Sequence, residues 1–109
     1  MAIPGLHLTR IGDGDFLLEP SKSLNIPDQA KLIASITARL MQARASRLYY
    51  DLSDLVLIDP LYYAWLDTLA RSAQAINVKM ICINMQPTAA FALSRFIHKM
   101  PVFETAPGI

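Results

Sequence analysis

The stretch LYYDLSDLVLIDPLYYAWLDTLAR, residues 48–71, decides the fold of this chain. Its first half, residues 48–59, is largely apolar and has the length of a strand, which predicts a strand that ends at Asp59. Pro60 follows directly, and an aspartate before a proline is typical of a helix N-cap with proline at the first helical position. The chain is therefore expected to pass from sheet to helix at this junction.

Three amphipathic helices are predicted from the spacing of apolar residues. The first opens at Pro27, the second runs from Pro60 to about Ile76, and the third starts at Gln86. Their apolar positions are Ile33, Ile36 and Leu40 in the first helix, Tyr62, Leu66, Leu69, Ala73 and Ile76 in the second, and Ala89, Ala90, Leu93, Phe96 and Ile97 in the third.

Further strands surround these helices. Gly5 to Glu19 predicts a β-hairpin, because two apolar segments flank the Gly/Asp cluster at residues 12–15. Val78 to Met85 is an apolar run of strand length, and residues 102–105 form a plausible last strand. Strands and helices alternate after the hairpin, which predicts an α/β sheet with parallel pairing and crossover helices.

The chain has 109 residues, which predicts one domain, spanning residues 1–109, with a sizeable core. Hydrophobic residues make up 53% of it, so we expect either deep burial or an exposed contact surface. The formal charge of +1 gives no argument for nucleic acid or an anionic membrane as a partner, and we expect no nucleic-acid binding. Apolar runs fall short of the roughly 18 residues of a spanning helix. Because a signal peptide is also missing from the N-terminal segment, we expect no membrane insertion and a cytoplasmic location.

The sequence shows no catalytic or metal-binding pattern. His7 and His98 fall in different predicted elements, and neither has a cysteine, serine or carboxylate at the spacing of a triad or metal site. Cys82 is the only cysteine and lies in an apolar strand, where it is expected to be a buried small residue. We therefore expect a non-enzymatic protein with no catalytic residue, no cofactor and no metal.

Two charged clusters have alternative interpretations. Asp51, Asp54 and Asp59 could hold Mg²⁺, but Asp59 is explained as the helix cap and Asp54 as a bend residue. Three arginines near the end of the first helix could bind phosphate, but cations also suit the negative end of a helix dipole. The structural interpretation is favoured in both cases.

Two neighbouring tyrosines lie at the start of the second predicted helix. Tyr62 and Tyr63 cannot both face the same core, because adjacent helical residues point in different directions. Tyr62 falls on the apolar stripe, so Tyr63 is the better candidate for an exposed partner contact, since aromatic anchors are enriched at interfaces.

Four segments occur in the order and spacing of a known family. They are Asp51-Leu52-Ser53-Asp54, Ile58-Asp59, the apolar strand at residues 78–83, and Gln86-Pro87 at the start of the third helix. With these segments the chain resembles the STAS family, named for sulfate transporters and anti-sigma factor antagonists, over nearly its whole length. The resemblance implies a STAS-like mixed sheet of four to five strands, opening with a β-hairpin and packed with about three helices.

The resemblance also implies a regulatory binding module, an anti-sigma factor antagonist or a stressosome scaffold protein of the RsbS and RsbR type. The implied partners are serine/threonine kinases of the histidine-kinase-like ATPase fold, other STAS chains, or both. The implied partner surface consists of Pro20, Ser21, Lys22, Ser23, Leu24, Asp59, Pro60 and Tyr63.

In switchable members of the family, the residue after the helix-capping aspartate is a serine or threonine that a partner kinase phosphorylates. Here Pro60 occupies that position and has no hydroxyl. A phosphate there would be stabilised by the helix N-terminus, so a hydroxyl would make a sensible switch. Two interpretations stay open. Either the binding surface is not toggled at this place, or Pro60 is simply a good first helical residue and the switch lies elsewhere or is absent.

STAS domains usually add a C-terminal helix after a segment that resembles residues 105–109. Either this sequence stops before that helix or the protein lacks it; in both cases surface would be left bare, which favours a homodimer or larger assembly. One alternative is a STAS domain that binds a nucleotide or lipid beneath the second helix, and another is a soluble subunit of a transporter. The residues that could line such a ligand pocket are Met80, Met85, Phe91, Phe96 and Met100.

Overall fold

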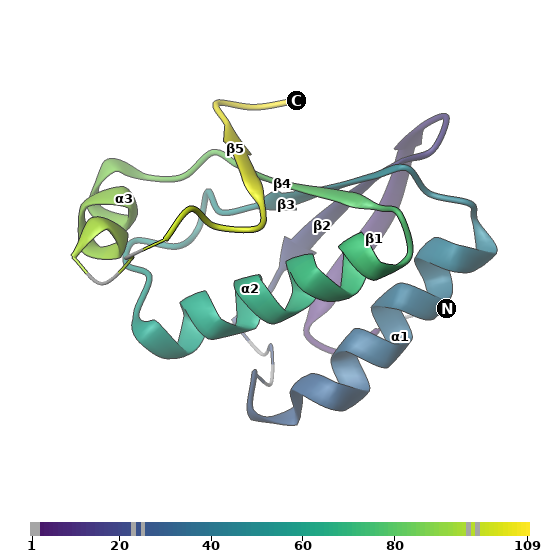
Figure 1. Ribbon diagram of the computed structural model, residues 1–109, viewed down its shortest axis with the longest axis horizontal. Helices are drawn as coiled ribbons and strands as arrows, with labels where there is room; N and C mark the ends of the chain where they lie inside the picture. The colour runs from purple at the N-terminus through teal and green to yellow at the C-terminus, as the bar shows by residue number, and fades with distance from the viewer. Residues whose placement is uncertain (1–2, 23, 25, 96, 98) are drawn as a thin grey trace.

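The computed structural model describes residues 3–22, 24, 26–95, 97 and 99–109. Within these residues, five strands and three α-helices follow one another along the chain (Figure 1). The strands are β1 (Leu6–Gly12), β2 (Asp15–Pro20), β3 (Arg47–Asp51), β4 (Lys79–Ile83) and β5 (Glu104–Ala106). The helices are α1 (Gln29–Gln42), α2 (Pro60–Ala75) and α3 (Pro87–Ser94), and a short 3-10 helix, η1 (Ile26–Asp28), precedes α1.

The five strands form one mixed sheet in the order β1-β2-β3-β4-β5. β1 and β2 are antiparallel, whereas each later neighbour pair is parallel. This arrangement confirms the predicted α/β fold, with a hairpin first and crossover helices between parallel strands. In the hairpin turn, Gly14 adopts a φ of 80°, which suits glycine, and its carbonyl accepts hydrogen bonds from Ser46 N and Arg47 N at 2.7 and 3.1 Å. The turn therefore also fixes the start of β3.

The core lies between the sheet and helices α1 and α2, which run along one side of it (Figure 1). Alternate strand residues point into this layer because strand side chains alternate between the two faces. Two rows of paired residues result, Phe16, Leu48 and Met80 in one and Leu18, Tyr50 and Cys82 in the other, and all six are buried. The helices supply the facing side chains Leu32, Ile36, Leu40, Trp65, Leu66, Leu69, Ala70 and Ala73.

The strand predicted for residues 48–59 is too long, because β3 ends at Asp51. The Asp51 carboxylate accepts a hydrogen bond from Ser53 N at 3.0 Å, and Leu55 N donates to Leu52 O at 3.0 Å. These two turns fold residues 52–59 into a loop. An aspartate side chain that bonds the backbone two residues later competes with strand pairing in this way.

The helices differ from the predictions in detail. Pro27 lies in η1, so α1 begins two residues later, at Gln29. Leu32 is buried where Ile33 was expected, and Ile33 is only partly buried. In α2 the pattern missed Trp65, which is fully buried. The last strand is β5, at Glu104–Ala106 instead of residues 102–105. In the described part of the chain, none of the helices has the length and apolar character needed to cross a membrane.

Candidate binding surface at the start of α2

The start of α2 has the capping geometry that the sequence predicts. Asp59 has an extended backbone, and its carboxylate accepts a hydrogen bond from Tyr62 N at 2.7 Å. Its carbonyl accepts another from Tyr63 N at 2.9 Å. Pro60 is the first helical residue and is exposed, as Asp59 is. Pro60, the residue that the family resemblance equates with the phosphorylation position, thus lies at the accessible N-terminus of a 16-residue helix.

Large apolar side chains are exposed around this helix start. Val56 and Leu57 in the preceding loop are 55% and 62% exposed to solvent, and Leu61 in the first turn is 56% exposed. Phe91 in α3 keeps 67%. Apolar residues of this size, gathered next to a helix start, are typical of an interaction surface.

Leu57 and Phe91 line a shared groove of about 450 Å³, which we call the apolar groove. Its other lining residues are Pro87, Thr88, Ala92 and Arg95. Thr88 Oγ1 donates a hydrogen bond to Val56 O, which ties the loop to α3. The Arg95 guanidinium lies 5.6 Å from the centre of the Phe91 ring. The groove is therefore apolar, with one cation at its wall.

A second hollow, of about 350 Å³, lies at the carboxyl ends of the parallel strands β2 and β3, and we call it the edge hollow. Its lining residues are Pro20, Ser21, Lys22, Leu24, Ile26, Asp51, Asp54, Leu55 and Tyr62. Four of the predicted partner-surface residues, at positions 20–22 and 24, are brought together here. Asp59, Pro60 and Tyr63 do not line it. Ser23, the remaining predicted residue, lies outside the described residues.

A chain of hydrogen bonds joins the core residues Trp65 and Tyr50 to Tyr62, which is one of the lining residues of the edge hollow. The Trp65 indole Nε1 donates to the Tyr50 hydroxyl at 2.9 Å, and the hydroxyls of Tyr50 and Tyr62 are 2.6 Å apart. Burial raises the pKa of Tyr50 well above its ordinary value, and burial also raises the pKa of Tyr62. Both phenols therefore stay protonated at neutral pH.

Tyr63 is less exposed than the sequence suggests. It is half-buried, and its ring packs edge-on against Phe103, with ring centres 6.1 Å apart. The exposed apolar residue at the start of α2 is Leu61, which sequence reasoning missed because it lies off the helix's apolar stripe. That off-stripe position is the signal that could have identified it.

Of the residues proposed to line a ligand pocket beneath α2, Met80, Phe91 and Met100 lie in different environments, and Met85 is partly buried. Met80 is buried in the core, whereas Phe91 and Met100 are exposed, the latter at 91%. Phe96 lies outside the described residues, as does His98. The predicted pocket is therefore wrong for Phe91 and Met100, which are exposed, because apolar spacing alone does not say which side chains other segments cover.

The three aspartates have structural partners or lie in solvent. The Asp51 carboxylate accepts hydrogen bonds from Ser53 N and from Asn84 Nδ2, the latter at 3.2 Å, and Asp59 caps α2. Asp54 is exposed. Among the described residues, no group of three His, Cys, Asp or Glu side chains is placed to hold a metal ion. Cys82 is fully buried, as predicted, and burial raises the pKa of its thiol.

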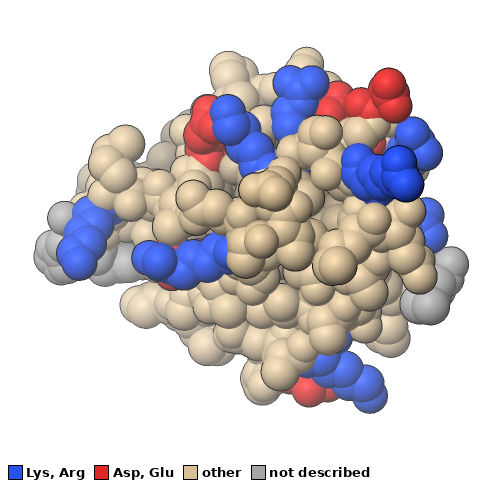
Figure 2. All heavy atoms as spheres, turned by 45° about the vertical axis from the view of Figure 1, so that its right-hand side comes forward, with Lys and Arg blue, Asp and Glu red and all other residues tan. Residues whose placement is uncertain are grey.

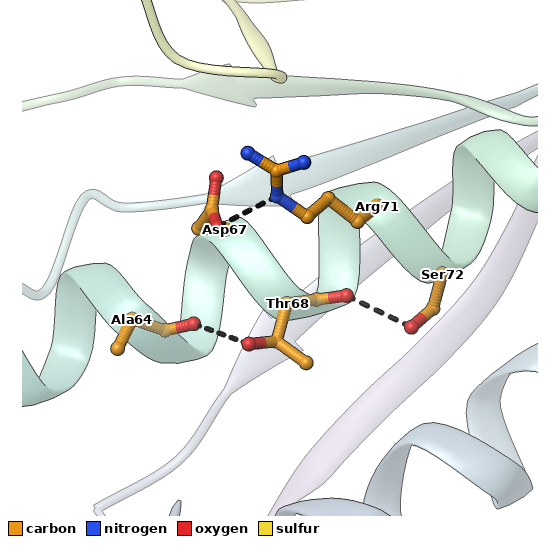
Figure 3. A network of polar contacts seen from close by, with 5 residues as sticks. All are labelled: Ala64, Asp67, Thr68, Arg71 and Ser72. Carbon is orange, nitrogen blue, oxygen red and sulfur yellow. Dashed lines mark hydrogen bonds and ion pairs between the residues drawn. The ribbon is translucent and has the colours of Figure 1, made fainter. Parts of the chain in front are cut away.

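The outer side of α2 is polar and its hydrogen bonds stay within the helix (Figure 3). Thr68 Oγ1 donates to Ala64 O and Ser72 Oγ to Thr68 O, both at 2.8 Å, and Arg71 pairs with Asp67 at 2.9 Å. Pairs four residues apart on a helix satisfy each other in this way. The apolar contact surface is thus confined to the beginning of α2 and does not continue along it.

Basic residues do not gather into one patch on the face seen in Figure 2, where Lys and Arg are scattered and several stand beside Asp or Glu. Arg47, one of the three arginines near the end of α1, pairs with Asp15 at 3.0 Å. Lys79 pairs with Glu104 at 2.8 Å. Of the three arginines, Arg47 thus has a structural partner, which favours the structural interpretation for this residue.

Comparisons with known proteins identify the fold. No family model and no curated protein matches the chain. Among solved structures, a Ser-to-Glu variant of RsbS from Moorella thermoacetica matches 94% of this chain and 88% of its own, with a TM-score of 0.79 and 15% identity.

Two further structures agree with this match. The NMR structure of the protein TM1081 matches 99% of this chain and 83% of its own (TM-score 0.71, 14% identity). A chain from the molecular architecture of the stressosome, described as a signal integration and transduction hub, matches 94% of this chain and 89% of its own (TM-score 0.68, 16% identity). The chain therefore has a STAS-like α/β fold, with a five-stranded mixed sheet that opens with a β-hairpin.

Proposed function

We propose that this protein is a non-enzymatic regulatory module that acts by binding other proteins. Its role would be that of an anti-sigma factor antagonist or a stressosome-scaffold-like STAS protein in the cytoplasm. The proposal rests first on the fold, which is shared with RsbS and with a stressosome chain at low identity. A fold by itself does not define a function, so the proposal also depends on the residues exposed at the surface.

The observation that carries the proposal is the apolar surface at the start of α2. The apolar groove and the exposed side chain of Leu61 lie next to a capped helix N-terminus, where Pro60 stands in solvent. Exposed large apolar residues have a cost in water that an interface removes. We propose that this surface, together with the segment at residues 20–24, contacts the partner.

The partner would be a kinase of the histidine-kinase-like ATPase fold or another STAS chain, including a second copy in a homodimer or larger assembly. Pro60 gives the complex a specific property, since proline has no hydroxyl to phosphorylate. Binding at this surface would then not be regulated by phosphorylation of residue 60. Two mechanisms follow: a permanently competent antagonist, or a structural member of an assembly.

The test is an affinity pull-down from the host lysate with three tagged proteins: the wild type, Leu57→Asp combined with Phe91→Asp, and the control Met41→Asp. Met41 is an exposed apolar residue of α1, away from the groove in sequence and fold. Recovery of an ATPase-fold kinase or a STAS chain by the wild type and the control, but not by the double variant, would support the proposal. Equal recovery by all three would place the interface elsewhere, and recovery of neither partner class would refute the proposed role.

A further inference from the structure

We propose that the edge hollow binds a small zwitterionic molecule with a short apolar body, of the class of apolar α-amino acids. This inference goes beyond the protein-binding role: the hollow includes residues 20–22 and 24 of the proposed partner surface, but it has no lining residue in common with the apolar groove, and we assign it a small ligand of its own. It rests on the position of the hollow, on a directed hydrogen-bond donor, and on charges that lack partners within the described chain.

The position of the hollow suits a ligand. It lies at the carboxyl ends of two neighbouring parallel strands, β2 and β3, between the segment before α1 and the loop before α2. Its volume of about 350 Å³ is at the small end of the range for ligand sites. A molecule the size of one amino acid fits such a space.

The hydrogen-bond chain from the core fixes the direction of a donor. Trp65 Nε1 can only donate, so the Tyr50 oxygen accepts from it. Tyr50 is fully buried, and its own proton needs an acceptor, for which the Tyr62 oxygen at 2.6 Å is the partner in the described residues. Tyr62 therefore receives a hydrogen bond and keeps its own proton to donate. Since Tyr62 lines the hollow, a ligand with an acceptor oxygen would be held there.

Charged groups complete the chemistry. Lys22 and Asp54 line the hollow, and neither has an ion pair or hydrogen bond with another described residue. The Oδ1 atom of Asp51 accepts the hydrogen bonds from Ser53 N and Asn84 Nδ2, and its Oδ2 atom has no hydrogen-bond partner among the described residues. Two carboxylates suit an ammonium group, and Lys22 with the Tyr62 hydroxyl suits a carboxylate. A zwitterion satisfies both sets at once.

The remaining wall is apolar. Leu24 and Ile26 come from the segment before α1, and Leu55 comes from the loop before α2. These side chains provide a surface for a branched aliphatic group, and its burial would add affinity. The arrangement therefore favours an amino acid such as leucine over a polar one.

The first experiment is an NMR titration of the ¹⁵N-labelled full chain with L-leucine up to about 20 mM, which covers millimolar dissociation constants. Two truncated analogues are titrated in parallel: 3-methylbutylamine, which lacks the carboxylate, and 4-methylpentanoate, which lacks the amine. We expect saturable shifts at the amides of Leu55 and Tyr62 for L-leucine and at least about tenfold weaker binding of both analogues. Absence of saturable shifts, shifts at a different site, or equal binding of either analogue would overturn the proposal.

Variants then test the two recognition elements. Asp54→Asn removes an exposed charge and should weaken L-leucine binding about tenfold, whereas the control Asp13→Asn in the hairpin turn should leave it unchanged. Tyr62→Phe should weaken binding about threefold to tenfold, against the control Tyr49→Phe. If Tyr62→Phe fails to fold, because Tyr50 then lacks an acceptor, Asp54→Asn decides the outcome. Unchanged affinity in Asp54→Asn contradicts the proposed ligand class.

Discussion

The indole Nε1 of Trp65 donates a 2.9 Å hydrogen bond to the hydroxyl of Tyr50, and both side chains are fully buried between α2 and the sheet. Trp65 belongs to the helix and Tyr50 to β3, so this polar contact crosses the main packing interface, as does the contact between the hydroxyls of Tyr50 and Tyr62. Apolar packing tolerates small shifts of a helix on a sheet, whereas a buried hydrogen bond has a narrow geometry. The hydrogen bond between Trp65 and Tyr50 therefore fixes the position of α2 on the sheet.

Replacing Tyr50 by phenylalanine should destabilise the protein. Tyr50→Phe keeps the ring but leaves the Trp65 N–H buried without an acceptor, which costs about 1–3 kcal/mol of unfolding free energy. Urea unfolding followed by Trp65 fluorescence measures this difference. Tyr49→Phe, at the next position on the opposite face of the sheet, is the matched control and should change stability by less than about 0.5 kcal/mol. Equal effects of the two changes would show that the Trp65 hydrogen bond contributes nothing.

The same tyrosines predict a loss of stability at alkaline pH. Burial is the main cause that raises the pKa of Tyr50 and Tyr62 above the ordinary value of 10.0. Deprotonation is then easier in the unfolded chain, so this contribution is fully present below pH 10 and declines as pH rises above it. Unfolding free energies measured between neutral pH and the alkaline range should show the decline. A Tyr50→Phe variant with the same slope would contradict the assignment.

Removing the cap of α2 should have a smaller, local effect. Asp59→Ala deletes the acceptor for Tyr62 N and should cost about 1 kcal/mol of unfolding free energy. Asp54→Ala in the same loop serves as the control, because Asp54 is exposed and has no recorded partner among the described residues. Chemical denaturation of both variants tests the cap, and a loss in Asp54→Ala as large as in Asp59→Ala would argue against it.

Pro60→Ser should create a phosphorylatable helix N-terminus. The fold should survive with a loss of about 0.4–1 kcal/mol, because serine gives the unfolded chain more freedom than proline does. In the proposed constitutive complex, phosphorylation of this serine by the partner kinase should weaken binding, which isothermal titration before and after phosphorylation would measure. Unchanged affinity after confirmed phosphorylation would rule out the constitutive mechanism.

Cys82 should be almost unreactive in the folded protein. It is fully buried, and burial raises the pKa of its thiol, so the reactive thiolate forms only when the chain opens. A thiol-labelling reagent should modify it at least about a thousandfold more slowly in native buffer than in denaturant. Fast labelling of the native protein would show that β4 opens locally.

The sequence by itself determined the α/β order, the hairpin, the three helices and the cap at Asp59. These features depend on local chemistry: apolar spacing, a Gly/Asp turn, and an aspartate before a proline. The sequence predicts these features correctly because each depends on residues that are close together in the chain. The end of β3 was misplaced, since the apolar run from Leu52 to Ile58 looks the same whether it is a strand or a loop until the bond from Ser53 N to Asp51 is known.

Only the tertiary structure decided where the surfaces lie. Phe91 and Leu57 are 34 residues apart, yet they share a groove, and Tyr62 of α2 lines the edge hollow together with Pro20 of β2 and Asp51 of β3. An apolar side chain belongs to the core or to a contact surface according to which helices and strands pack over it. Those helices and strands come from distant parts of the chain, and the order of strands in the sheet decides where they lie. Local spacing specifies the elements, and burial by distant segments assigns each side chain its role.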